Sequence, residues 1–254
     1  MSPETFRALG YQVVDAVAGF LGSLRGRPVT PAEAPGDVRA VLGQAPLPEE
    51  GSAPAALLEE ASRLLFDHSL FNGHPRFWGY ITSSAAPIGA LADLLAAAVN
   101  PNAGAWALSP MASEIEAQTV RWIAELIGYP RDCGGLLVSG GNMANFVGFL
   151  AGRRAKATWD VRAGGLAAGE SPLRVYASRE THTWVEKAAD LFGLGTDAIC
   201  WIPADAAQRM DVAALERQVR ADRAAGYAPL LVAASAGTVG TGAVDPLPAI
   251  AEVC

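Results

Sequence analysis

The sequence predicts an α/β protein in which a mostly parallel sheet, with helices on both faces, follows an N-terminal helical arm. Residues 1–70 carry helical patterns that are interrupted by a Pro- and Gly-rich connection. From about residue 85, short apolar, strand-like runs alternate with helical patterns. Strands that are separated by helices pair in parallel through crossovers, which is the arrangement of α/β folds.

The arm begins with an amphipathic helix. Its apolar residues recur every three or four positions and form one stripe: Phe6, Leu9, Val13, Val17, Phe20, Leu21 and Leu24. Such a stripe must be covered by another domain or another subunit. We therefore divide the chain into an arm over residues 1–84 and a sheet-forming domain over residues 85–254.

The sheet-forming domain is predicted to alternate strands with helices. Strands are expected at residues 136–139, 174–178, 198–202 and 230–234. Helices are expected at about residues 87–99, 110–128, 143–157, 183–193, 211–225 and 246–254. A crossover helix needs a following strand to return to the sheet, and the last helix has none, so we expect an incomplete domain.

The composition excludes several classes of protein. The 254 residues are 51% hydrophobic and 18% charged, which is too apolar for a disordered chain. The 19 basic and 26 acidic side chains give a net charge of −7, whereas nucleic-acid binding favours a basic surface. Three cysteines without paired spacing predict neither a disulfide framework nor a zinc site. The chain has only two lysines, Lys156 and Lys187.

The sequence does not predict export or membrane insertion. The first residues lack a basic n-region and carry Glu4, Arg7 and Asp15 within the apolar pattern, so no signal peptide is expected. The most apolar stretch, residues 85–99, is too short to span a bilayer and contains Asp93. We expect a cytoplasmic protein that binds neither membranes nor nucleic acid.

The first candidate site is the segment LLVSGGNMANF, residues 136–146. A predicted strand leads there through glycines directly into a helix. Glycines let a ligand approach the backbone, and the free N–H groups at a helix start attract an anion. A phosphate held by the amides of Gly141, Asn142 and Met143 is the functional interpretation. The alternative is a structural turn, since the segment matches neither common glycine motif for phosphate binding.

The second candidate site is His182, in the segment VYASRETHTWVEKA, residues 175–188. A strand is predicted to end near Ser178, and Thr183 with Glu186 forms a predicted capping box for the next helix. His182 therefore lies at the carboxyl end of a strand, where open α/β sheets bind their ligands. The alternative is a surface histidine beside a helix cap.

The third candidate site is the segment ASAGTVGTGAVDPL, residues 234–247, which follows another predicted strand. It brings glycines and the hydroxyls of Thr238 and Thr241 to the same edge of the sheet, where either hydroxyl could donate to a phosphate. A Gly-rich loop without a ligand is the alternative. Three strand ends that offer small, hydroxyl and imidazole groups at one edge favour a binding site there.

The fourth candidate site is the segment GHPRFWGYITSS, residues 73–84, in which aromatic side chains including Trp78 and Tyr80 gather. They could form the wall of a pocket for an apolar or aromatic substrate. The alternative, favoured by the segment taken alone, is an aromatic cluster that packs the arm onto the larger domain.

The spacing of the histidines and acids predicts neither a metal site nor a pair of catalytic acids. His68 and His74 lack an obvious carboxylate partner, so no metal is expected. Glu114 and Glu116 follow Ser109-Pro110, and we interpret them as acids near a helix start rather than as catalytic acids.

Taken together, these segments resemble the pyridoxal-phosphate-dependent group II amino-acid decarboxylases, the family of aromatic L-amino-acid decarboxylase. The resemblance runs from Phe6 to the C-terminus in the family's order. No single motif is diagnostic, but the ordered set is specific. Its members are the helical arm, HPRFWGY, the Trp106-x-x-Ser109-Pro110 run with Glu114 and Glu116, SGGNMAN, YASRETHTWVEKA and AGTVGTGAVD.

The resemblance implies a type I PLP-dependent transferase-like large domain, truncated at its C-terminal side, from an enzyme that decarboxylates an L-amino acid to an amine and carbon dioxide. It implies that His182 stacks on the ring of the cofactor, pyridoxal 5′-phosphate, and faces the substrate as a catalytic residue. It also implies a homodimer, with the arm around the partner and a shared substrate pocket. The implied cofactor contacts are Gly141, Asn142, Met143, His182 and Thr238, and the implied substrate contacts are Tyr80 and Ser83.

The chain departs from the family at two places in the expected pockets. Many relatives have Thr-Glu or Ala-Ser where this chain has Asn142 and Met143, which removes a hydroxyl contact to the phosphate but leaves the backbone amides. Residues 102–104, before Trp106, are Asn-Ala-Gly instead of the bulky residues of some aromatic decarboxylases.

Two family residues match no position of this chain: the lysine that binds the cofactor and the Asp that holds its pyridine nitrogen. Lys156 ends a helical pattern and Lys187 lies within the helix after His182, so neither fits that role. We expect the N-terminal portion of a decarboxylase, inactive by itself, whose continuation begins with a strand bearing Asp and later carries His-Lys. The alternatives are a non-catalytic PLP-fold or dimerisation module, and another type I PLP enzyme such as a lyase or aminotransferase.

Overall fold

The computed structural model describes residues 1–254, and the chain forms two compact units, Met1–Asn100 and Pro101–Cys254. The first unit is helical, and the second unit contains the sheet. The helix at residues 87–99 belongs to the first of these units. The predicted domain boundary after residue 84 stays a prediction about the complete fold.

The helices of the first unit share one start signal, because each begins with a proline. Proline suits the first helical turn, where its fixed φ is already helical and its missing N–H would have no partner. Ser2 strengthens the first start by accepting the N–H of Thr5 at 3.1 Å. The helices are α1 (Pro3–Ser23), α2 (Pro35–Leu42), α3 (Pro54–Asp67) and α4 (Pro87–Val99), with a short 3₁₀ turn at Leu24–Gly26.

Part of the apolar stripe of α1 is covered by α3. The ring of Phe20 stacks on Phe66 with centroids 4.5 Å apart and also contacts Phe71. Arg27 lies over Phe20 and donates from Nη1 to the carbonyl of Phe66 at 2.7 Å. The beginning of the stripe remains open, since Phe6 is 57% exposed. The cover predicted for the stripe therefore comes partly from within the same unit.

The two histidines of the first unit have structural partners. His74 is buried, donates from Nε2 to the carbonyl of Arg27 at 3.0 Å and accepts the N–H of Arg76 on Nδ1. His68 pairs through Nδ1 with the carboxylate of Glu33 at 2.8 Å. The expectation that neither histidine has a carboxylate partner is thus wrong for His68, because the pair is brought together by tertiary packing across a long sequence separation.

The second unit alternates strands and helices as predicted from β1 onward, whereas three helices follow one another before β1. The helices are α5 (Pro110–Leu126), α6 (Gly141–Lys156), α7 (Val161–Gly164), α8 (Trp184–Leu191), α9 (Val212–Ala224) and α10 (Leu247–Val253). The strands are β1 (Leu173–Ser178), β2 (Ile199–Ile202) and β3 (Ala228–Ala233). Short 3₁₀ turns lie at Trp106–Leu108, Leu166–Ala168 and Thr196–Ala198.

In the whole chain, no helix combines the length and the apolar character needed to cross a bilayer.

The strands form one parallel sheet in the order β2-β1-β3, which confirms the predicted crossovers. The predicted strand at residues 136–139 is wrong. Leu136 and Leu137 are exposed, and the N–H of Leu137 donates to Oε1 of Glu116 at 2.7 Å. An apolar run becomes a strand only when it pairs with another strand, and this segment pairs with none of the three.

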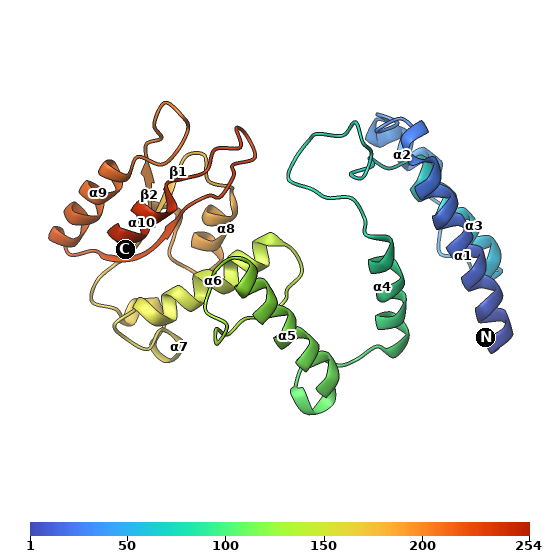
Figure 1. Cartoon of the computed structure of the whole chain (residues 1–254), viewed down its shortest axis with the longest axis horizontal. Helices are drawn as coiled ribbons and strands as arrows, with labels where there is room; N and C mark the ends of the chain where they lie inside the picture. Colours follow the sequence, from blue (N-terminus) through green and yellow to red (C-terminus); the bar gives the residue numbers. More distant parts are fainter. The chain divides into compact units, whose positions relative to one another are not determined.

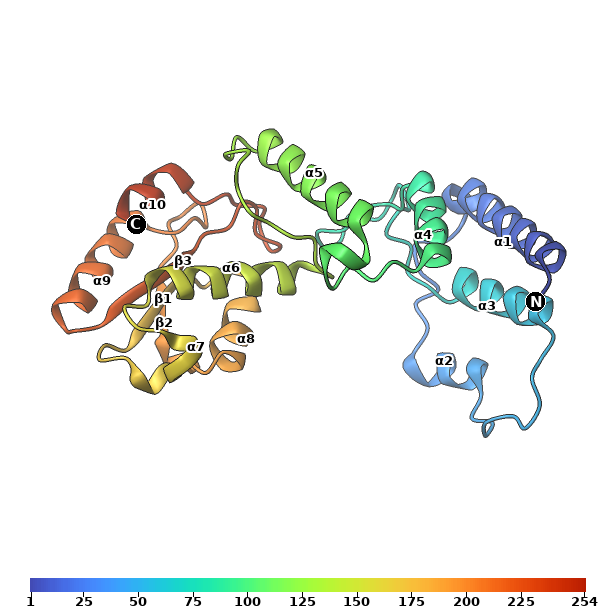
Figure 2. The ribbon, with the colours of Figure 1, turned by 90° about the horizontal axis from the view of Figure 1, so that it is seen from below.

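Helices cover both faces of the sheet (Figures 1 and 2). Val175 and Ala177 of β1 point into a core with Phe149 of α6 and the buried face of α8. Tyr176, between them in the strand, points into a second core with residues of α9 and α10 such as Leu215. This alternation follows from the two-residue period of a strand, and it makes β1 the centre of the unit.

One polar network lies inside the second core. The hydroxyl of Tyr176 donates to Oδ2 of Asp222 at 2.9 Å, and Nε2 of Gln218 donates to Oδ1 at 3.0 Å. The thiol of Cys200 lies 3.4 Å from the same Oδ2. Burial, followed by the hydrogen bond to Asp222, raises the pKa of the Cys200 thiol to about 11 and also raises the pKa of Tyr176. The network therefore joins β1, β2 and α9 through one carboxylate.

We expect Tyr176→Phe to lower the free energy of unfolding by about 2 kcal/mol, because a hydrogen bond to a buried carboxylate is lost. Urea unfolding of both proteins measures the change. Tyr129→Phe is the matched control, since Tyr129 is 60% exposed and its loss of a hydroxyl should change stability by less than about 0.5 kcal/mol. Equal stability of the two variants would show that the network contributes nothing.

Candidate functional site

The carboxyl ends of the three strands lie at one edge of the sheet, because the strands are parallel. The turn after β1 carries His182, and the loop after β3 carries Thr238. The two segments approach each other, since the position of a Cβ on Gly240 would lie 4.0 Å from Oε2 of Glu180. Open α/β sheets bind ligands at this edge, as the sequence predicts.

A buried turn fixes the end of β1. Ser178 is fully buried, and its N–H donates to Oγ1 of Thr181 at 3.1 Å. The N–H of Thr181 donates back to the carbonyl of Ser178 at 3.0 Å. The next residue, His182, is exposed. The backbone before it is thus anchored to the core, while His182 itself is exposed beyond the carboxyl end of the strand.

His182 itself caps the helix that follows it. Its Nδ1 accepts the N–H of Trp184, the first residue of α8, at 3.2 Å. The predicted capping box is wrong, because Thr183 has φ −58° and ψ −3° and makes no cap hydrogen bond. A capping side chain needs an extended backbone, and Thr183 is already helical. The hydrogen-bond pattern assigns the proton of the neutral imidazole to Nε2.

The start of α6 has the properties of an anion site. Gly140 has φ +85° and ψ 156°, a conformation that is essentially restricted to glycine. No side chain caps the helix and no acid lies in its first turn. The N–H groups of Gly141, Asn142 and Met143 have no acceptor in the protein. Together with the helix dipole, they present three free donors to an anion.

The space beside this turn is open. A Cβ placed on Gly140 or Gly141 would meet no atom within 4 Å. The donors and the space therefore fit a phosphate group, although the predicted strand before the turn is absent.

The loop after β3 is held by a residue that the sequence did not single out. Asp245 is buried and accepts two amides at 2.7 Å, from Met210 on Oδ1 and from Ser235 on Oδ2. Its own N–H donates to the carbonyl of Ser235 at 2.9 Å. In the sequence, Asp245 is only a single acid at the end of a Gly-rich loop. Its role in holding the loop can be recognised only once the amides that it accepts are known.

Thr238 and Thr241 face each other in this loop. Their hydroxyl oxygens are 2.8 Å apart, and Thr238 is buried. One hydroxyl donates to the other, so the pair keeps one O–H for a further acceptor. The prediction that they contact a phosphate is compatible with this geometry and stays a prediction.

The predicted substrate residues lie in the first unit. Tyr80 and Ser83 are both exposed, and Tyr80 has a positive φ of 58°. The ring of Tyr80 lies 6.4 Å from that of Phe77, centroid to centroid, and Trp78 is 90% exposed. Their role in substrate binding stays a prediction.

Lys156 lies far from the start of α6. Lys156 is the last residue of that helix, roughly 22 Å from Gly141 at the usual rise per residue. Lys187 is exposed on α8, whose buried side is formed by Val185, Ala188 and Ala189. The residues present fit a phosphate and a stacking imidazole, and the expectation that neither lysine binds the cofactor stays a prediction.

The two acids near the start of α5 have structural partners. Oε1 of Glu114 accepts the indole N–H of Trp106 at 2.9 Å, and Glu116 accepts the N–H of Leu137. Both lie beyond the first turn of α5, so they hold neighbouring segments instead of completing the helix start.

Comparison with known proteins identifies a family model over most of the chain. The model, described as the pyridoxal-dependent decarboxylase conserved domain, matches residues 35–254. Among curated proteins, an aromatic-L-amino-acid decarboxylase from Bacillus atrophaeus is 35% identical over the whole chain, which covers 51% of that protein. A tyrosine decarboxylase from Oryza sativa is 32% identical over the whole chain, which covers 48% of that protein. The chain spans about half the length of the curated relatives it matches.

Solved structures agree with the predicted fold. The crystal structure of mouse CSAD has a TM-score of 0.89 at 28% identity, and the comparison covers 100% of this chain and 53% of that one. The crystal structure of Oryza sativa TDC with PLP and tryptamine has a TM-score of 0.88, also at 28% identity and with the same coverage. The resemblance inferred from the motifs, and the incomplete type I fold that it implies, are confirmed.

We expect Gly140→Ala to lower the free energy of unfolding by about 2 kcal/mol, because alanine is strained at this φ and ψ. Gly148→Ala is the matched control in the exposed middle of α6, where a Cβ also meets no atom within 4 Å. It should stabilise the chain by up to about 1 kcal/mol through helix propensity. Opposite signs in urea unfolding are expected, and a neutral Gly140→Ala would contradict the strained turn.

Proposed function

This chain belongs to the pyridoxal-dependent decarboxylase family, and we propose that it carries the phosphate site of an enzyme that converts an L-amino acid to an amine and carbon dioxide. One observation carries the proposal: the start of α6 combines free amides, open space and an uncompensated helix dipole. The cofactor of such an enzyme is pyridoxal 5′-phosphate. When bound, it supplies an electron sink for the electrons left behind by carbon dioxide.

Backbone amides hold the phosphate in this proposal. Gly141, Asn142 and Met143 donate their N–H groups, and the helix dipole favours the dianion. The contacts need no particular side chain, so the departure from the family at Asn142 and Met143 leaves them intact. The free O–H of the Thr238–Thr241 pair is the proposed further donor, held in place by the two hydrogen bonds of Asp245.

His182 is the proposed catalytic residue of this chain. The amide of Trp184 fixes one nitrogen of its ring, so the imidazole is held without occupying Nε2. The exposed ring can then stack on the flat cofactor and present Nε2–H to the carboxylate of the substrate. Tyr80 and Ser83 are the proposed walls of the substrate pocket.

The covalent attachment of the cofactor requires a lysine that neither Lys156 nor Lys187 supplies. The curated relatives are about twice as long as this chain, and we assign the lysine and the Asp for the pyridine nitrogen to the part of the family fold that the chain does not span. The 254 residues by themselves are therefore expected to lack decarboxylase activity.

The test supplies, from a relative, the C-terminal half of the family fold that this chain does not span. A chimera joins residues 1–254 to the C-terminal half of the Bacillus atrophaeus relative, and release of carbon dioxide from L-amino acids is measured with added pyridoxal phosphate. We expect release by the chimera and a loss of at least about 100-fold in kcat for His182→Ala, the usual scale for a positioned catalytic group. A folded chimera that binds the cofactor but releases no carbon dioxide would contradict the proposal.

Two further outcomes separate the alternatives. Formation of a keto acid instead of carbon dioxide would indicate aminotransferase chemistry on the same fold. Borohydride treatment of the 254-residue chain with pyridoxal phosphate is expected to attach no cofactor to a specific lysine, as judged by mass spectrometry. Specific attachment at Lys156 or Lys187 would overturn the assignment of the lysine to the unspanned half.

A homodimer is the proposed assembly, with apolar helix faces of the first unit as the contact. Helix α4 has no buried residue and exposes large apolar side chains: Ile88, Leu91, Leu94, Leu95 and Val99. The exposed beginning of α1 adds Phe6 and Tyr11 to the apolar surface of the same unit.

The cytoplasm is the proposed location of the protein. All three cysteines are free thiols, as is usual in a reducing compartment.

Sedimentation equilibrium tests the dimer. We expect the native chain to form dimers and Leu95→Glu to be monomeric with an unchanged helical circular-dichroism spectrum, because a charge in an apolar interface is costly. Leu47→Glu is the control, since Leu47 is 91% exposed and lies outside the helices. A dimer that survives Leu95→Glu would exclude α4 from the interface.

A further inference from the structure

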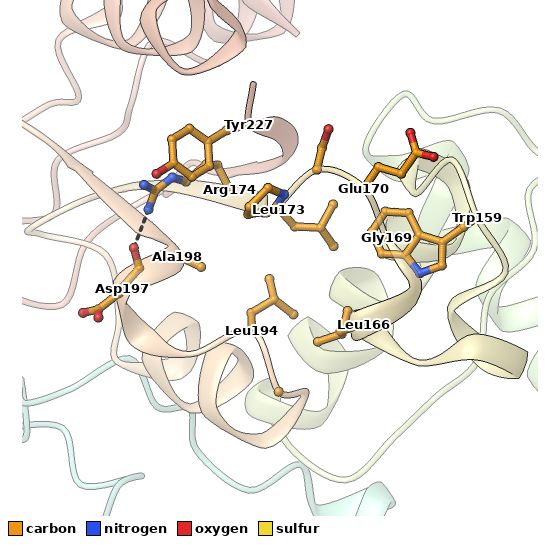
Figure 3. Close-up of a pocket in the computed structure, with 13 residues that line it drawn as sticks. Trp159, Leu166, Gly169, Glu170, Leu173, Arg174, Leu194, Asp197, Ala198 and Tyr227 are labelled. Carbon is orange, nitrogen blue, oxygen red and sulfur yellow. Dashed lines mark hydrogen bonds between the residues drawn. The ribbon is translucent and has the colours of Figure 1, made fainter. Parts of the chain in front are cut away.

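A pocket of about 530 Å³ lies at the opposite edge of the sheet from His182, where the three strands begin (Figure 3). Its residues come from the start of β1, the turn before β2 and the residue before β3, together with the segment after α6. Because β1 spans roughly 17 Å, this pocket is separate from the edge that carries His182. Its volume lies in the range of small-molecule sites.

Arg174 provides an unpaired positive charge in this pocket. Its guanidinium stacks on the ring of Tyr227 at 3.9 Å from the centroid, and Nη1 donates to the carbonyl of Asp197. Nε is buried without an acceptor, and no carboxylate forms an ion pair with the side chain. A buried donor without an acceptor is costly, and the guanidinium charge, which no carboxylate neutralises, is available to an anionic ligand.

The backbone beside Arg174 is irregular. The β1–β3 ladder shifts its register between Arg174 and Val175, opposite Pro229, which has no N–H to donate. Such irregularities are frequent next to functional sites and change the direction of a side chain. Here the shift lies at the rim of the pocket.

The other side of the pocket is apolar and aromatic. Leu166, Leu173 and Leu194 lie between Arg174 and Trp159 in Figure 3. The indole N–H of Trp159 donates to the carbonyl of Gly165 at 2.8 Å, so the ring has no polar group left for a ligand. The indole also packs on Gly169, where a Cβ would lie 2.3 Å from the ring. Trp159 is thus a fixed apolar wall.

The two acids of the pocket do not neutralise Arg174. Glu170 lies on the side of Trp159, across the pocket from the guanidinium, and the carboxylate of Asp197 points away from the pocket (Figure 3). Both side chains are exposed. The cavity therefore has a cationic end and an apolar, aromatic end.

We propose that this pocket binds a small aromatic carboxylate. The carboxylate pairs with the outer N–H groups of Arg174, and the aromatic ring lies on the leucines against Trp159. An amine with the same ring lacks the group that Arg174 recognises. The proposal rests on residues that the proposed active site does not use, so either can fail without the other.

Calorimetric titration of the full chain with phenylacetate and with phenethylamine tests this assignment. We expect binding of phenylacetate, no measurable binding of phenethylamine, and affinity for phenylacetate at least 10-fold weaker in Arg174→Met. Glu170→Gln is the matched control, because it removes a charge from the same pocket and should bind phenylacetate at least as tightly as the native chain.

Leu194→Trp gives a second test that keeps the charge of Arg174. It fills the pocket and should weaken phenylacetate binding at least 10-fold, with the fold checked by circular dichroism. Absence of phenylacetate binding to the native chain, equal affinity for phenethylamine, or unchanged affinity in a folded Arg174→Met or Leu194→Trp variant would each overturn the proposal.

Discussion

The complete burial of the last four residues of β1 is the constraint on which the second unit depends. Val175, Tyr176, Ala177 and Ser178 are all fully buried, so both faces and both edges of the strand need partners. β2 and β3 satisfy the backbone, α6 and α8 cover one face, and α9 and α10 cover the other. The hydroxyl of Tyr176 then requires Asp222, since a buried polar group without a partner is costly.

Burial of β1 also leaves the two ends of the strand free for binding. Ser178 is the last residue held on every side, and the chain turns to the exposed His182 within a few residues. At the other end, Arg174 precedes the fully buried part and reaches the rim of a pocket. A rigid strand therefore positions both groups without taking part in binding, as expected of a scaffold that carries sites on its loops.

The sequence predicted what depends on local pattern. Prolines and apolar periodicity located α4, α5 and α9. His182 was proposed as a site residue because it follows a strand-like run, and the structure confirms that strand as β1. The strand predicted at residues 136–139 was wrong, because an apolar run does not reveal whether another strand pairs with it. The predicted capping box at Thr183 was wrong because the backbone of Thr183 is already helical. The role of Asp245 was missed because the amides that it accepts, those of Met210 and Ser235, are distant in sequence. Contacts of this kind are set by the fold.

The position of Asp222 along the chain has a consequence for synthesis on the ribosome. Tyr176 must wait for a partner that is made 46 residues later, after β2 and most of α9. Until then the cover of its face of β1 is incomplete and its hydroxyl lacks the carboxylate of Asp222. This core therefore cannot be completed during synthesis until α9, and finally α10, have been made.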